Sequence, residues 1–148
     1  MIDVENIVVS AIVNALAEEH PEVTVYSTRT VAPAKFPCVM VYEVTSSEVT
    51  SLSTVDRVER FTDVNYTVEV YTNDAKKKQT CKELFSIVDD AVRRIVRDDE
   101  LGTASGLYRA GKTYHFSFNE SEVFIITGNY VGRVGEHPDN NSITFYRR

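Results

Sequence analysis

The pattern of hydrophobic and polar residues changes its period near the middle of the chain. Between Val64 and Tyr71, Val and Tyr residues alternate with polar residues, which predicts a half-buried β-strand that ends at Thr72. After Asp74, a plausible helix N-cap, apolar residues recur every three or four positions. This spacing predicts an amphipathic helix that ends near Arg97, with its apolar stripe formed by Cys81, Leu84, Phe85, Val88, Ala91, Val92 and Ile95.

The same reasoning places a helix or strand in most of the remaining chain. A first helix is expected over Ile2–Glu19, where His20-Pro21 stops it. The other predicted strands are Val23–Arg29, Pro37–Val44, a hairpin that pairs Thr113–Phe118 with Val123–Arg133, and a last short strand over Ile143–Arg147. This order predicts one α+β domain over residues 1–148, with a mainly antiparallel sheet and two helices packed on one face.

The segment Thr45–Thr62 differs in composition from the strands on either side of it. Its first half is rich in Ser and Thr, and its second half is β-like but strongly charged, with Arg57, Glu59 and Arg60. We interpret it as a projecting β-hairpin arm, while a surface loop is the alternative. Charged residues on a strand protect an exposed edge, and they also suit contacts that set the register between subunits.

Composition and charge narrow the classes of function. A chain of 148 residues fits a single core, and its net charge of −6 argues against a surface that grips nucleic-acid phosphates. The lysines Lys76–Lys78 therefore predict a solvated surface. The chain has no apolar run of membrane-spanning length and no basic segment typical of a signal peptide, so we expect folding in a cytoplasm without membrane contact.

The sequence predicts no catalytic, cofactor-binding or metal-binding residues. It contains none of the HExxH, CxxC, GxSxG, P-loop or GxGxxG motifs. Cys81 and His115 are the residue types of a nucleophile and its base, but Cys81 lies on the apolar stripe of its helix. Cys38 lies among strand residues. The acidic cluster Asp98, Asp99 and Glu100 lacks the alternating spacing of a calcium loop, so a solvated acidic turn is expected.

Several stretches together resemble the tail-terminator or tail-completion (neck) proteins of tailed bacteriophages and prophages. The stretches are FPCVMVYEV, the polar arm, DVNYTVEVYTND, LFSIVDDAVRRI and YHFSFNESEVFIITGNYVGRV. The resemblance covers nearly the whole chain except Asp139–Arg148. It implies a virion protein, made in the host cytoplasm, that forms a hexameric ring at the head-proximal end of the tail. Such a ring would contact the tail tube protein and a head-completion or neck protein, and DNA would pass through its lumen without specific binding.

If the chain forms a ring, two oppositely charged patches are expected to meet across the subunit interface. The predicted interface residues are Arg57, Glu59 and Arg60, with Lys76–Lys78 on the basic side, and Asp98, Asp99 and Glu100 on the acidic side. Three alternatives stay open: another head–tail joining or minor capsid protein, a small cytoplasmic enzyme, and a monomeric module that binds a peptide with the arm.

Overall fold

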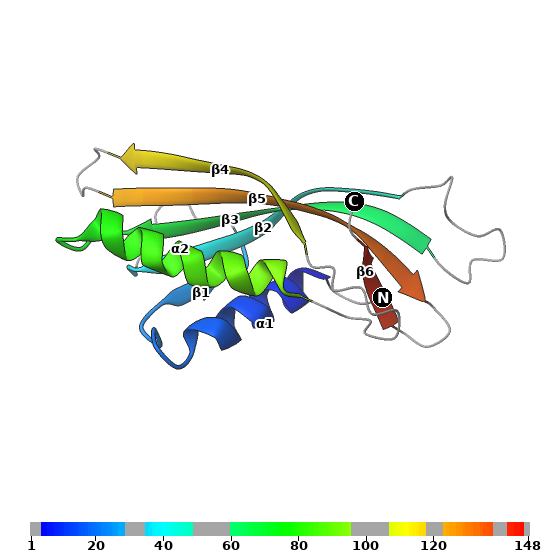
Figure 1. Cartoon of the computed structure of the whole chain (residues 1–148), viewed down its shortest axis with the longest axis horizontal. Helices are drawn as coiled ribbons and strands as arrows, with labels where there is room; N and C mark the ends of the chain where they lie inside the picture. The colour runs from blue at the N-terminus through cyan, green and yellow to red at the C-terminus, as the bar shows by residue number, and fades with distance from the viewer. Residues whose placement is uncertain are drawn as a thin grey trace.

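The computed structural model describes residues 4–28, 35–48, 60–95, 107–117, 123–137 and 142–146. Its elements follow the predicted order and include the last short strand. They are α1 (Val4–Leu16), β1 (Thr24–Tyr26), β2 (Cys38–Glu48), β3 (Arg60–Thr72), α2 (Lys77–Arg93), β4 (Tyr108–Ser117), β5 (Val123–His137) and β6 (Ser142–Tyr146). Figure 1 shows α1 and α2 together on one face of the sheet, which confirms the predicted α+β layers.

Six strands form one sheet in the order β1-β2-β3-β5-β4, and β6 pairs with β5 beyond the end of β4. Neighbouring strands are antiparallel except β1 and β2, which are parallel. The sheet is therefore mainly antiparallel, as predicted. The prediction took neighbouring strands to be joined by short connections, which does not hold for β1 and β2. Residues 27–37 join β1 to β2, and a connection of about a dozen residues is long enough for a parallel crossover.

The core lies between the sheet and the two helices, and every residue that the sequence predicted for it is buried. Those residues are Val8, Ile12, Leu16, Val39, Val41, Val68, Val70, Leu84, Phe85, Val88, Val92 and Ile125. Ile125 nevertheless lies on the other face of the sheet, because it pairs with Tyr71, whereas its neighbour Ile126 pairs with Val70 and packs in the core.

The ends of α2 differ from the prediction. The helix starts at Lys77, and Lys76, not Asp74, occupies the N-cap position without a side-chain capping bond. The Asp74 carboxylate instead accepts a hydrogen bond from the Thr80 hydroxyl at 2.8 Å. The helix ends at Arg93 rather than near Arg97, because the chain turns at the C-cap residue.

Candidate functional site

The hairpin of β2 and β3 extends beyond the ends of the two helices (Figure 1). The two strands stay paired as far as Glu48 opposite Thr62. Figure 1 shows these strands, together with β5, continuing past the ends of α1 and α2. On β2, the side chains of Val44, Thr45 and Ser46 are exposed. Beyond the helices β3 stays paired with β5 as far as Arg60 opposite Glu136, so the described residues 45–48 and 60–62 continue the main sheet. Residues 49–59 lie outside the described residues, and the projecting arm stays a prediction.

The residues predicted for a subunit interface are mostly beyond the described parts of the chain. Arg60 is the first residue of β3, where it pairs with Glu136 of β5. Arg57 and Glu59 lie outside the described residues, and so does the acidic cluster of Asp98, Asp99 and Glu100. The proposed meeting of these two patches therefore stays a prediction.

On the face of the sheet opposite the helices, polar side chains bond to one another across strands. Arg133 of β5 donates from Nε and Nη2 to the two carboxylate oxygens of Asp63 on β3, at 2.9 and 3.3 Å. This two-point contact raises the pKa of Arg133. Nearby, the Thr67 hydroxyl donates to Oδ1 of Asn129 at 3.0 Å. Since these contacts join β3 to β5, they hold the register of the longest strand pair.

Glu69 is a buried carboxylate on this same face. Its two oxygens accept hydrogen bonds from the hydroxyls of Tyr42 and Tyr71, the latter at 2.7 Å. Burial, and then the charge of Glu69, raise the pKa of the Cys38 thiol to about 12. A thiol held protonated is a poor nucleophile, so this group of side chains suits a structural role better than chemistry.

A second buried carboxylate lies between α2 and the sheet. Oδ1 of Asp89 accepts a hydrogen bond from the Tyr130 hydroxyl at 2.7 Å. Oδ2 lies 3.2 Å from Nη1 of Arg109 and 3.5 Å from Nη1 of Arg93. Burial and the bond to Asp89 raise the pKa of Tyr130. Both oxygens of Asp89 are thus occupied, and the group links α2 to β4 and β5.

The sequence reasoning missed this link. The spacing of four residues between Asp89 and Arg93 predicts an exposed ion pair on the helix surface, but Asp89 is buried while Arg93 stays exposed. The signal was present in the spacing, because Asp89 follows Phe85 by four residues and precedes Val92 by three. It therefore lies within the apolar stripe, where a carboxylate needs partners of its own.

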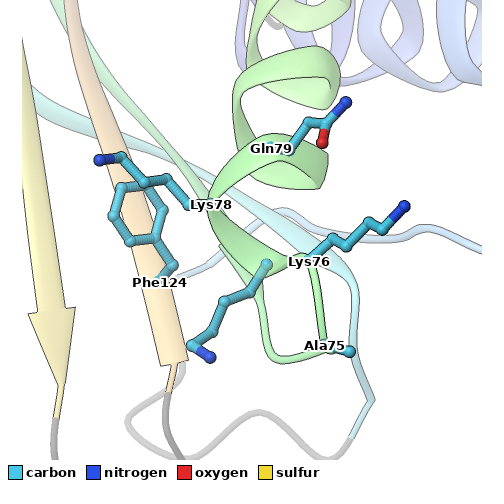
Figure 2. Close-up of a pocket in the computed structure, with 6 residues that line it drawn as sticks. Ala75, Lys76, Lys78, Gln79 and Phe124 are labelled. Atoms are coloured by element: carbon cyan, nitrogen blue, oxygen red, sulfur yellow. The ribbon is translucent and has the colours of Figure 1, made fainter.

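The lysines at the start of α2 surround an open hollow that is also lined by Ala75, Gln79 and Phe124. Figure 2 shows the side chain of Lys78 lying beside the Phe124 ring, while the side chain of Lys76 points away from it. Because these two ammonium groups do not converge on one point, the hollow is not shaped to hold a small anion. This arrangement agrees with the predicted solvated basic surface.

The candidate nucleophile and base are not brought together. The Cys81 thiol faces the core and donates to the Val70 carbonyl at 3.2 Å, and burial raises its pKa to about 11. His115 pairs with Ile125, so it lies on the opposite face of the sheet. Among the described residues, no group of three or more His, Cys, Asp or Glu side chains is placed to hold a metal ion. No helix in the described ranges is long and apolar enough to cross a membrane.

Comparisons with known proteins give a likeness among solved structures. No family model matches the chain. No curated protein matches its sequence either. Among solved structures, the chain is similar to one from the virion of a native gene transfer agent (GTA) particle, with 15% sequence identity and a TM-score of 0.39. The alignment covers 82% of this chain and 84% of that one.

Proposed function

We propose that this protein is a structural subunit of a tailed-phage or prophage virion. In this proposal it forms a ring, expected to be a hexamer, at the head-proximal end of the tail. The ring ends polymerisation of the tail tube and joins the tail to the head, without a cofactor and without catalysis. Support comes from the stretches that resemble tail-terminator proteins, and from an element order and layering that agree with the fold predicted alongside them.

The observation that carries the proposal is the extension of β2 and β3 beyond the helices. A hairpin of this length exposes Val44 and two neighbouring polar side chains while keeping its own strands paired to Glu48. Among the described residues nothing covers these three side chains. A contact with another subunit would bury them and remove apolar surface from water.

The state of the buried charged groups also favours assembly over chemistry. Asp89, Glu69 and Asp63 each have both carboxylate oxygens bonded to tyrosine or arginine partners within the fold. Both thiols are buried with raised pKa values. In the described parts of the chain, polar groups therefore hold the sheet and helices together and leave no nucleophile paired with a base.

Deleting Ser47–Thr54 tests the role of the arm. The proposal predicts a folded monomer that no longer forms rings or caps tails, so that tail tubes grow to uncontrolled length. A matched control replaces the same eight positions with Gly and Ser residues. This variant keeps the length of the segment and removes all its side chains larger than that of Ser. If the deletion variant assembles as well as the wild type, the segment is a surface loop and the proposal loses its main support.

Charge reversal tests the predicted patches. Changing Arg57 and Arg60 to Glu is expected to impair ring formation, and changing Asp98, Asp99 and Glu100 to Lys in the same chain is expected to restore part of it. Exposed charges are screened over about 8 Å at physiological ionic strength, so added salt should slow assembly before it unfolds the subunit. Light scattering follows both effects. If neither added salt nor either set of substitutions changes ring formation, these patches do not lie in the interface.

Electron microscopy of tail tubes mixed with the protein separates the proposed role from that of another head–tail joining protein. A terminator is expected to cap one end of each tube and to stop its growth. A joining protein would instead bind the portal side of the head and leave tube length unchanged. The second result would keep the virion role and move the protein to another position in the neck.

A further inference from the structure

Two strands of the sheet have outer edges that no described strand covers. β4 pairs with β5 along one side only, and its other side has no described partner from Tyr108 to Ser117. β2 is covered by β1 only at Cys38–Met40, and no described strand pairs with its outer edge at residues 43–48. These two edges lie on opposite borders of the sheet. Unpaired edges with free N–H and C=O groups are ready to pair with another strand.

The two open edges also carry exposed apolar side chains. The described residues include three large hydrophobic side chains that are exposed, and the two most exposed are Tyr114 on β4, at 54%, and Val44 on β2, at 52%. Pairing the two edges would cover Tyr114, which lies within the paired stretch of β4, and would place Val44 beside the contact. Within the described part of the subunit both side chains stay more than half exposed.

The charges on the two edges are opposite. Lys112 on β4 pairs with Gly128, and Glu43 on β2 pairs with Tyr66, so the register places both side chains on the helix-covered face of the sheet. Both side chains are exposed. An acidic strand edge on one border and a basic one on the other are complementary only between two copies of the chain.

We propose that β4 of one subunit pairs with β2 of the next subunit and extends the sheet across the interface. This inference rests on the proposed homo-oligomer and names the strands that join it. β2 and β5 run in one direction while β3 and β4 run in the other, so the new pair is antiparallel when the helices of both subunits lie on the same side. The contact joins two different edges, which is the type of interface that closes a ring.

Register shifts limit which residues take part. The shifts lie between Glu43 and Thr45 on β2 and between Arg109 and Gly111 on β4. Bulges of this kind weaken indiscriminate pairing at an edge. The regular stretches that remain are residues 45–48 of β2 and residues 111–117 of β4, and we assign the strand pairing to these. Glu43 then lies just beyond the paired residues of β2, on the same face of the sheet as Lys112.

Disulfide cross-linking tests the pairing and its direction. Thr113 and His115 on β4 and Thr45 on β2 lie on the helix-free face, whereas Ser46 lies on the helix-covered face. One variant carries an added cysteine in place of Thr113 or His115, and a second carries one in place of Thr45 or Ser47. The two variants are mixed and oxidised mildly. The native Cys38 and Cys81 are buried, and their raised pKa values keep them out of the reaction. We expect cross-linked dimers from at least one same-face pair, because a disulfide needs Cβ atoms about 3.5–4.5 Å apart.

The controls are built into the same set. A cysteine at Thr113 should not link to one at Ser46, since they lie on opposite faces, and Ser10→Cys on the outside of α1 should link to neither strand. If Thr113 links to Ser47, then His115 should link to Thr45, because positions move in opposite directions along an antiparallel pair. Wild-type rings with no same-face cross-link would overturn this inference alone, whereas a wild-type monomer would overturn the proposed ring as well.

A mixing experiment gives a second, independent readout. Lys112→Glu places acidic residues on both edges, and Glu43→Lys places basic residues on both, so each variant alone should lose most of its rings. Mixed in equal amounts, the two variants alternate around the ring and every interface again joins opposite charges. We expect native mass measurement to show recovered rings with an even number of copies. If both variants are folded but their mixture forms no rings, the proposed pairing of these edges is wrong.

Discussion

The hydroxyl of Tyr130 on β5 donates a hydrogen bond of 2.7 Å to the Asp89 carboxylate on α2, and both residues are buried. This contact is a polar link between the helix layer and the centre of the sheet. Arg109 and Arg93 share the other carboxylate oxygen, so the negative charge is balanced at the same place. The orientation of α2 on the sheet is therefore fixed by a specific bond as well as by apolar packing.

Removing the Tyr130 hydroxyl tests this link. Tyr130→Phe should lower the free energy of unfolding by about 1.5–3 kcal/mol, the usual range for a hydrogen bond to a charged group. Tyr114→Phe is the matched control, since Tyr114 is exposed and the same change there should stay within about 0.5 kcal/mol. Urea denaturation measures both. Equal losses in the two variants would mean that the bond to Asp89 contributes nothing specific.

Gly128 lies where the ring of Phe85 packs against the sheet. A Cβ atom at this position would lie 2.9 Å from Cζ of Phe85 and 2.9 Å from Cε2 of Tyr130. Gly128→Ala should therefore cost about 1–3 kcal/mol, as overpacking in a core does. At Gly111 the nearest atom is Nδ2 of Asn129 at 3.9 Å, so Gly111→Ala should be almost neutral. Thermal unfolding that affects both variants alike would show that Phe85 does not pack at Gly128.

The buried thiols predict a dependence of stability on alkaline pH. A thiol has an ordinary pKa of about 8.5, whereas folding raises the pKa of Cys81 to about 11. The unfolded chain therefore loses this proton first, so the stabilisation is complete below the ordinary value and is lost as the pH rises toward 11. Urea denaturation at several pH values should show a smaller decline for Cys81→Ala than for the wild type. Parallel declines would mean that another group is responsible.

The periodicity of the sequence was sufficient for the elements and most of the core. The alternation from Val64 to Tyr71 and the stripe that includes Leu84 and Phe85 each report which side of an element is apolar, and the structure confirms that this side is buried in both. The strand is more than half-buried, however, because Thr67 and Glu69 on its polar side are buried too. A glycine inside a strand pattern, such as Gly128, indicates a bulge or a close approach to the backbone, and here the ring of Phe85 makes that approach.

Other features depend on contacts between residues that are far apart in the chain. The parallel pairing of β1 with β2 follows from the path of a connection, which hydrophobic spacing does not encode. The burial of Asp89 depends on Tyr130 and Arg109, which arrive from strands more than fifteen residues away in sequence. The open edges of β2 and β4 likewise become visible only when the strand order is known.

The most direct test of the central claim is the native mass of the purified full-length protein, measured together with electron microscopy of the same sample. The account predicts a closed ring with the mass of a small whole number of copies, expected to be six, which dissociates when Ser47–Thr54 is deleted. A protein that stays a monomer at concentrations well above those of a virus-producing cell, with and without the deletion, would contradict it.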